Sequence, residues 1–283
     1  MSLSTILLEN ETFALEICPA LGAKVVSLVA KQSGRNLLFE SVAPLRLASY
    51  GAAFSDFDTS GIDDCFPTID PWEEEGLSYP DHGALWSLPM EITKKENALT
   101  SRFSLEETMG LPITGERTIA LDGDKVFYTF TVKNHGDTPI PYIWAFHGLF
   151  SPEGARLLLP FSKEDVILLD GKMPEGLEDF SSYPENATSK WAFPGPCPEG
   201  EIGYLYEKDG FALLLDWDRT ETPYLACWVS TGGFKGEKNW ALEPMSAAFD
   251  TPGDRPHLPG STLFPHESRT HHLTLTYREV RHG

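Results

Sequence analysis

Short runs of alternating apolar and polar residues, separated by glycine and proline, limit the fold of this chain more than any other feature. Its 283 residues include 24 Gly and 22 Pro, which interrupt the chain so often that few segments can form a helix of three turns. Within residues 125–134, the residues Val126, Tyr128, Phe130 and Val132 recur with the period of two that a half-buried strand requires. Similar runs occur at residues 12–17, 24–30, 113–121, 211–217, 224–230 and 271–277.

The pattern predicts an all-β fold. Residues 91–109 contain neither Gly nor Pro, yet their apolar residues keep no helical face, and Lys95-Glu96-Asn97 is typical of a hairpin turn between two strands. Many short strands separated by turn signals predict an antiparallel sandwich or a barrel. No change in composition marks a linker, so we expect one domain over residues 1–283. Residues 170–201, rich in Pro, Gly, Ser and Glu, are expected to form a long surface excursion.

The net charge of the chain restricts the classes of molecule that it can bind. The formal net charge is −20, from 42 acidic and 22 basic residues, and such a surface repels nucleic acid and anionic lipid. We therefore expect a small-molecule partner that is neutral or cationic, with no role for nucleic acid or a membrane. The first residues lack a basic region, and their apolar run stops at Glu9, unlike a secretory signal peptide. No stretch approaches the ~20 apolar residues of a membrane span, so the sequence predicts a cytoplasmic protein.

Cysteines and histidines give no metal signature. The four cysteines, Cys18, Cys65, Cys197 and Cys227, form no Cys-x-x-Cys pair, which indicates buried free thiols rather than a zinc site or disulfides. No histidine pair has a metal-binding spacing. The chain also lacks a Gly-x-Ser-x-Gly motif, a phosphate-binding glycine loop and a dinucleotide fingerprint. We expect neither a metal nor a cofactor.

Three ionisable residues lie in aromatic or apolar segments: His82 in YPDHGALW, His147 in IWAFHGLF and Glu243 in WALEPMSAAFD. Charged residues are rarely buried without a partner, and perturbed titrating groups cluster at functional sites. Partial burial would raise the pKa of Glu243 and make it a better base, while histidine is the natural proton donor near neutral pH. The plainer alternatives are a core histidine bonded to a neighbour and a strand-end glutamate paired with Arg or Lys.

Two nearby acidic segments add candidates. Asp81 precedes His82 and can orient its imidazole, although sequence neighbours often point apart on a strand. Asp63 and Asp64 lie beside Cys65, and one of them is expected to hydrogen-bond a hydroxylated ligand.

With these segments in order, the chain resembles the galactose mutarotase-like superfamily, which includes the aldose 1-epimerases. The resemblance runs from near residue 12 to near residue 277. It rests on five segments, which are LGAKVVSLVAKQSGRNLLF, GIDDCFPT with DHGALW, AFHGLF, LEPMSAAFD, and the following LPGSTLFPHES.

The resemblance implies a large β-sandwich whose concave face holds a sugar and an enzyme that interconverts its anomers. It makes Glu243 the base that removes the proton from the anomeric hydroxyl, and His147 the acid that protonates the ring oxygen. The ring then opens, the C1–C2 bond rotates and the reverse transfers close the other anomer. His82 would hold the substrate and share the acid role.

Differences from the family's sequence motifs restrict which class of sugar can be the substrate. The galactose-specific branch carries an arginine near the first motif and a glutamine where this chain has Ala226. The hexose-6-phosphate branch carries arginines where this chain reads Thr59-Ser60 and Leu85-Trp86. Their absence favours an unphosphorylated aldose. Trp86 and Trp228 are expected to stack on the sugar ring, with plain core packing as the alternative.

The leading hypothesis is an aldose 1-epimerase-like isomerase with Glu243 and His147 as catalytic residues and His82, Asp64, Trp86 and Trp228 as substrate-binding residues. A non-catalytic carbohydrate-binding protein on the same fold is one alternative. A carboxylate-dependent glycosidase or lyase is another, and it requires Asp64 and Glu243 to face each other.

Overall fold

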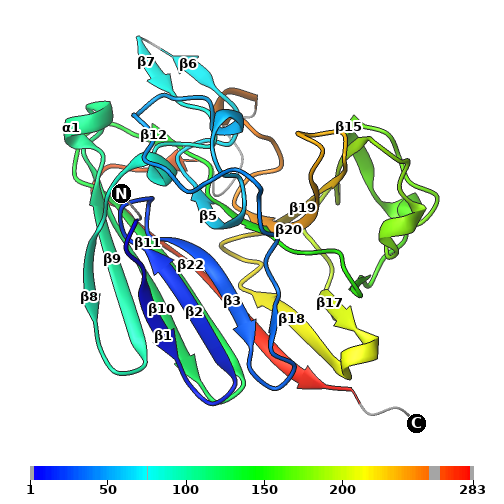
Figure 1. Cartoon of the computed structure of the whole chain (residues 1–283). Coiled ribbons are helices and arrows are strands. Elements are labelled where there is room, and N and C mark those ends of the chain that lie inside the picture. The colour runs from blue at the N-terminus through cyan, green and yellow to red at the C-terminus, as the bar shows by residue number, and fades with distance from the viewer. Residues whose placement is uncertain (1–2, 75, 255–261, 281–283) are drawn as a thin grey trace.

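Two large antiparallel β-sheets pack face to face (Figure 1). The structure is a computed structural model that describes residues 3–74, 76–254 and 262–280. Aromatic side chains join the two layers; Tyr128 of one sheet and Phe146 of the other meet edge to face at 5.3 Å. The buried apolar core lies between these layers, so the structure confirms the expected all-β sandwich.

The ten-stranded sheet comprises, in spatial order, β1 (Ile6–Glu9), β2 (Phe13–Cys18), β3 (Lys24–Ala30), β5 (Gly61–Cys65), β13 (Ala145–Leu149), β20 (Lys238–Met245), β19 (Tyr224–Thr231), β16 (Thr188–Ala192) and β15 (Ile167–Gly171), with β4 (Arg35–Asn36) paired to β3. The eight-stranded sheet comprises β14 (Arg156–Leu158), β17 (Gly203–Tyr206), β18 (Phe211–Trp217), β22 (Ser268–Glu279), β11 (Lys125–Asn134), β10 (Ile113–Asp122), β9 (Ala98–Ser104) and β8 (Glu91–Lys94). Two short ribbons, β6 (Trp72–Glu74) with β7 (Leu77–Tyr79) and β12 (Ile140–Pro141) with β21 (Thr262–Leu263), complete the pairing, and the helix α1 spans Glu106–Met109.

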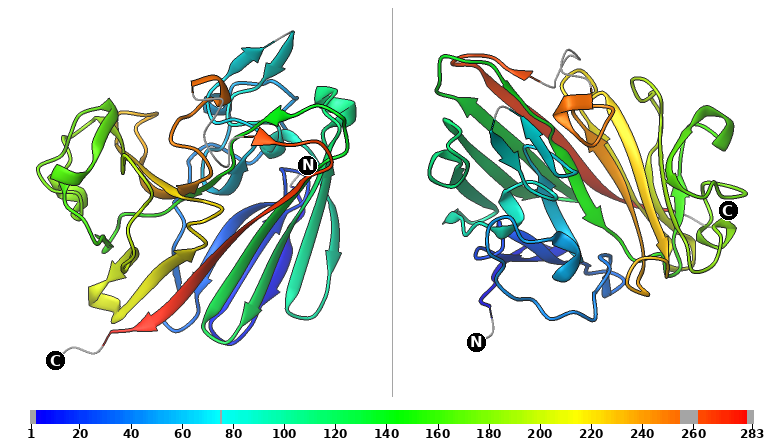
Figure 2. Two further views of the ribbon diagram at one scale, coloured as in Figure 1. Left: turned by 180° about the vertical axis from the view of Figure 1, so that it is seen from behind. Right: turned by 90° about the horizontal axis from the view of Figure 1, so that it is seen from above.

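The strands follow the sequence pattern closely. All seven alternating runs are strands, and β8 and β9 form the expected hairpin around residues 95–97. In β11 the alternate residues Val126, Tyr128, Phe130 and Val132 are buried, whereas Phe127 between them is 38% exposed. Near the carboxyl terminus, β22 pairs with β11 on one side and β18 on the other (Figure 2).

The two sheets differ in how their outer faces are covered. Strands such as β11 leave one side to solvent, but every residue of β5 and of β13 is buried. A strand buried on both faces has a second layer of protein over its outer side. The candidate site lies between this covering layer and the outer face of the ten-stranded sheet.

The interpretation of residues 170–201 as a surface excursion is wrong in part. Within this region, β16 pairs along its length with β19 and buries Trp191 completely. Its five residues are too short a signal to stand out among the surrounding turn formers.

All four cysteines are free and buried, as expected. Among the described residues, no helix is long and apolar enough to cross a membrane. In the resembling segment LPGSTLFPHES, residues 258–261 lie outside the described residues.

Candidate active site

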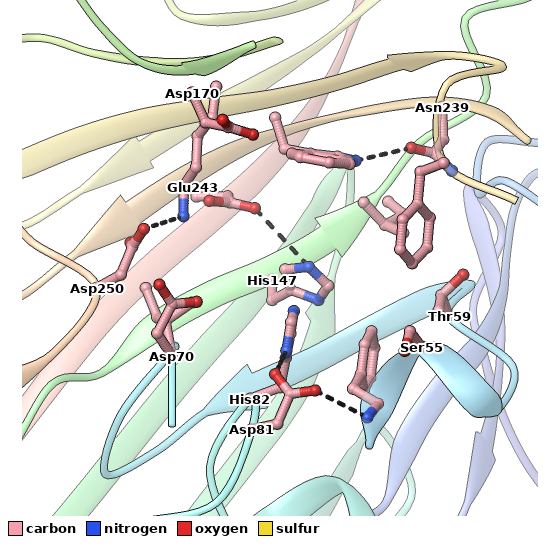
Figure 3. A pocket seen from close by; sticks show the side chains of 16 residues that line it. Ser55, Thr59, Asp70, Asp81, His82, His147, Asp170, Asn239, Glu243 and Asp250 are labelled. Carbon is pink, nitrogen blue, oxygen red and sulfur yellow. Dashed lines mark hydrogen bonds and ion pairs between the residues drawn. The ribbon is translucent and has the colours of Figure 1, made fainter. Parts of the chain in front are cut away.

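A cavity of about 360 Å³ opens on the outer face of the ten-stranded sheet (Figure 3). Its lining side chains come from β13, β15, β16, β19 and β20, from the segment between β3 and the 3₁₀ turn at Leu85–Ser87, and from the segments that precede and follow β20 (Phe234 and Asp250). Because side chains alternate across a strand, the cross-strand register determines which residues share this face. Glu243, His147, His82 and Trp228 all line the cavity, so four of the six sequence candidates are brought together.

Glu243 is almost wholly buried on β20, where it lies opposite Ala226 of β19. Burial raises the pKa of its carboxyl to about 7, the charge of Asp250 acts in the same direction, and the charges of Lys190 and His82 oppose it. A carboxyl with a pKa near 7 exchanges protons readily at neutral pH, as a general base must.

His147 lies on β13 with its Nε2 atom 3.8 Å from Oε1 of Glu243. Burial lowers the pKa of this imidazole well below its usual value, and the nearby charges of His82, Lys24 and Lys190 lower it further. Its Nδ1 atom has no hydrogen-bond partner among the described residues. Burial and the neighbouring charges therefore favour the neutral form of the His147 imidazole.

His82 is held by its neighbour Asp81, whose Oδ1 lies 2.7 Å from the imidazole Nδ1. The expected orienting role is possible because His82 has a φ of 56°, a left-handed conformation that turns it away from strand geometry. Gly83 follows with a φ of 74°, and a Cβ there would lie 2.2 Å from the carbonyl oxygen of Phe66. Backbone conformation and close packing therefore require the glycine at position 83.

The two candidate tryptophans have different positions. Trp228 lines the cavity, and its indole N–H donates to Oδ1 of Asn239 at 3.1 Å. Trp86 does not line it: the side chain is buried behind Phe54, with ring centroids 5.2 Å apart, and its N–H donates to the carbonyl oxygen of Asp81. For Trp86 the alternative of core packing applies, and we leave it out of the proposed site.

Asp64 also lies elsewhere. Its side chain points into the core, where it forms an ion pair with Arg117 at 2.8 Å and accepts hydrogen bonds from Tyr128 at 2.8 Å and Trp144 at 2.9 Å. The reason is strand parity, because Asp63 lies opposite His147 in the register and the next residue faces the other way. With its carboxylate saturated inside the sandwich, Asp64 is not part of the proposed site. A glycosidase or lyase that uses Asp64 with Glu243 loses its geometric basis.

Sequence reasoning missed a charged pair in the cavity wall. Nζ of Lys190, on β16, lies 2.6 Å from Oδ2 of Asp250. Burial opposes the charge of Lys190, but Asp250 and Glu243 outweigh it and raise the pKa of the ammonium. A lysine inside the strand-like run TSKWA and the aspartate that ends LEPMSAAFD were the available signals.

Within the described parts of the chain, no group of three or more His, Cys, Asp or Glu side chains is arranged to hold a metal ion.

The antiparallel β-sandwich is the fold that the resemblance implied. No family model matches the chain, and no curated protein matches its sequence. Solved structures do share its fold. The Slr1438 protein from Synechocystis sp. PCC 6803 superposes with a TM-score of 0.75 at 18% identity, covering 99% of this chain and 97% of the other.

Two further structures carry descriptive names. A putative aldose 1-epimerase from Escherichia coli K12 has a TM-score of 0.66 at 16% identity, covering 99% of this chain and 100% of the other. The GalM/aldose epimerase homologue from C. elegans has a TM-score of 0.66 at 13% identity with the same coverage. The chain therefore has the galactose mutarotase-like fold over nearly its whole length.

Proposed function

We propose that the protein is an aldose 1-epimerase-like isomerase that interconverts the anomers of an unphosphorylated aldose. The observation that carries this proposal is the cavity in which Glu243, with a pKa of about 7, lies beside His147 and His82. A binding protein needs hydrogen-bonding groups, but it does not need a buried carboxyl poised to exchange protons beside two imidazoles.

In the proposed mechanism, the carboxylate of Glu243 takes the proton from the anomeric hydroxyl, and that electron pair forms the C1 carbonyl. The C1–O5 bond breaks as a histidine gives its proton to O5. Rotation about C1–C2 and reversal of both transfers produce the other anomer. The family resemblance makes His147 the acid and gives His82 a substrate-binding role with a share in the acid role, and both residues line the cavity.

The walls of the cavity support a neutral substrate. Its lining includes five carboxylates, which are Asp70, Asp81, Asp170, Glu243 and Asp250, but a single lysine or arginine side chain among the described residues, Lys190. Because Lys190 is already paired with Asp250, a phosphate group would meet net repulsion. Trp228 and Phe54 supply aromatic surface for the apolar face of a sugar ring. A cytoplasmic location remains a prediction.

The test is a panel of freshly dissolved single-anomer sugars, with anomer exchange followed by NMR and spontaneous mutarotation as the blank. We expect acceleration for at least one unphosphorylated aldose. Glu243→Gln and His147→Asn should each lower the rate by roughly 10²–10⁴-fold while the fold survives.

Glu116→Gln, on the far sheet and half-exposed, is the matched control and should keep full activity. Unchanged exchange in both cavity variants would contradict the assignment. Sugar binding without any acceleration by the wild-type protein would instead support the carbohydrate-binding alternative.

A further inference from the structure

The two histidines of the cavity have different surroundings, and we propose that His82, positioned by Asp81, delivers the proton to the ring oxygen. His147 then acts as a neutral group beside Glu243. This inference rests on the proposed function and gives Asp81 a role as a positioning residue.

Asp81 is fixed by three contacts. One carboxylate oxygen lies 2.7 Å from Nδ1 of His82, and the other accepts the backbone N–H of Phe54 at 2.9 Å. Its carbonyl oxygen accepts the indole N–H of Trp86 at 3.0 Å. A carboxylate held in this way keeps the proton of His82 on Nδ1 and leaves Nε2 as the reactive nitrogen.

The imidazole of His82 is also fixed in direction. It stacks on Phe54 with centroids 4.1 Å apart and planes 10° from parallel, and it meets the ring of His147 at 5.1 Å. In Figure 3, His82 lies between Asp81 and His147, and its second nitrogen points away from Asp81 toward His147. Nε2 of His82 is therefore presented to the cavity that holds the base.

Electrostatics divide the two rings further. Burial raises the pKa of Asp81, but the hydrogen bond and the positive charge of His82 outweigh it, and the net pKa lies below its usual value. The positive charge of His82 also lowers the pKa values of Asp70 and Glu243. His147 lacks any such partner on Nδ1 among the described residues, and a charged His82 opposes a second charge there.

The proton balance is complete with these groups. Nε2–H of His82 protonates O5 as the C1–O5 bond breaks, which leaves His82 neutral with Nδ1–H still bonded to Asp81. Glu243 accepts the proton of the anomeric hydroxyl in the same step. Ring closure returns both protons, so the enzyme ends each cycle in its starting state.

The decisive variant is Asp81→Asn, which keeps the size and an acceptor oxygen but removes the negative charge. We expect kcat to fall roughly tenfold to a thousandfold with KM changed less than about threefold. The pH profile of kcat should also change, because the variant removes the carboxylate charge that interacts with His82. Asp209→Asn is the matched control, since Asp209 pairs with Arg35 at 2.8 Å with a similar exposure, 27% against 26% for Asp81.

A second measurement needs no variant. Ring ¹⁵N chemical shifts of the wild-type protein should show a proton on Nδ1 of His82 and a neutral ring for His147. A charged His147, or an Asp81→Asn profile that coincides with the wild type, would overturn the inference. Failure of the proposed function has a different signature, because the wild-type protein would then accelerate no sugar.

Discussion

Asp64 and Glu243 are both buried carboxylates of the ten-stranded sheet, yet they lie on opposite faces and have opposite surroundings. Asp64 meets Arg117, Tyr128 and Trp144, all within hydrogen-bond distance. Glu243 faces His147 at 3.8 Å, and burial raises its pKa to about 7. The carboxylate of Asp64 has hydrogen-bond partners for both oxygens inside the core, whereas Glu243 faces a cavity with a raised pKa. Within one sheet, Asp64 therefore has a structural role, and Glu243 is the candidate for proton transfer.

The largest expected effect is on stability. Asp64→Ala leaves the guanidinium of Arg117, which is 1% exposed, without its carboxylate. Removing one partner of a buried pair typically costs about 3–5 kcal/mol, a large part of the stability of a domain. Chemical denaturation should therefore show a fall of that size in the free energy of unfolding.

Glu116→Ala provides the comparison, because the pair of Glu116 with Arg102 is about half-exposed and worth under about 1 kcal/mol. Equal losses in the two variants would contradict the structural role of Asp64.

Glu243→Gln should have the opposite effect on stability. The folded protein holds the proton of Glu243 up to about pH 7, but the unfolded chain releases it near the ordinary glutamate pKa of 4.5. Because the folded state binds more protons between these values, the wild type loses stability as pH rises through this window. The variant has no such loss. As the pH rises from about 4 to about 8, its free energy of unfolding should therefore increase by up to about 3 kcal/mol relative to that of the wild type.

Denaturation curves across that range test the point. A constant difference between Glu243→Gln and the wild type would show that the carboxyl titrates normally in the folded protein.

The smallest effect concerns the pair that sequence reasoning missed. The charge of Lys190 lowers the pKa of Glu243 and that of Asp250 raises it, so Lys190→Met should move the low-pH limb of the rate profile to higher pH. Asp250→Asn should move it to lower pH. A limb shift of half to one unit changes the rate at pH 6 roughly threefold to tenfold, and Lys190→Arg should restore the wild-type limb. Shifts in the same direction for both variants would rule out this coupling.

Much of this molecule was predictable from local pattern. Alternation placed the strands, since the pleat repeats every two residues. His82, His147 and Glu243 were found because each contradicts its apolar surroundings. Alternation along GIDDC predicts that Asp63 and Asp64 point to opposite faces of the sheet. Only the cross-strand pairing of Asp63 with His147 shows that Asp63 is on the cavity side and that Asp64 points into the core.

Other site features depended on contacts that local pattern does not encode. The conformation of His82, with φ of 56°, lets Asp81 reach its imidazole, and the packing of Phe54 separates Trp86 from the cavity. Lys190 and Asp250 lie 60 residues apart in sequence and meet only when β16 joins the sheet.

By itself, therefore, the sequence determined an all-β fold, the positions of its main strands and three ionisable residues in apolar company. Only the tertiary structure decided which carboxylate is paired inside the core and which faces the cavity with a raised pKa. The physical reason is that the pKa of a buried group depends on burial and on charges brought close by pairing of distant strands, and these have no counterpart in a local run of residues.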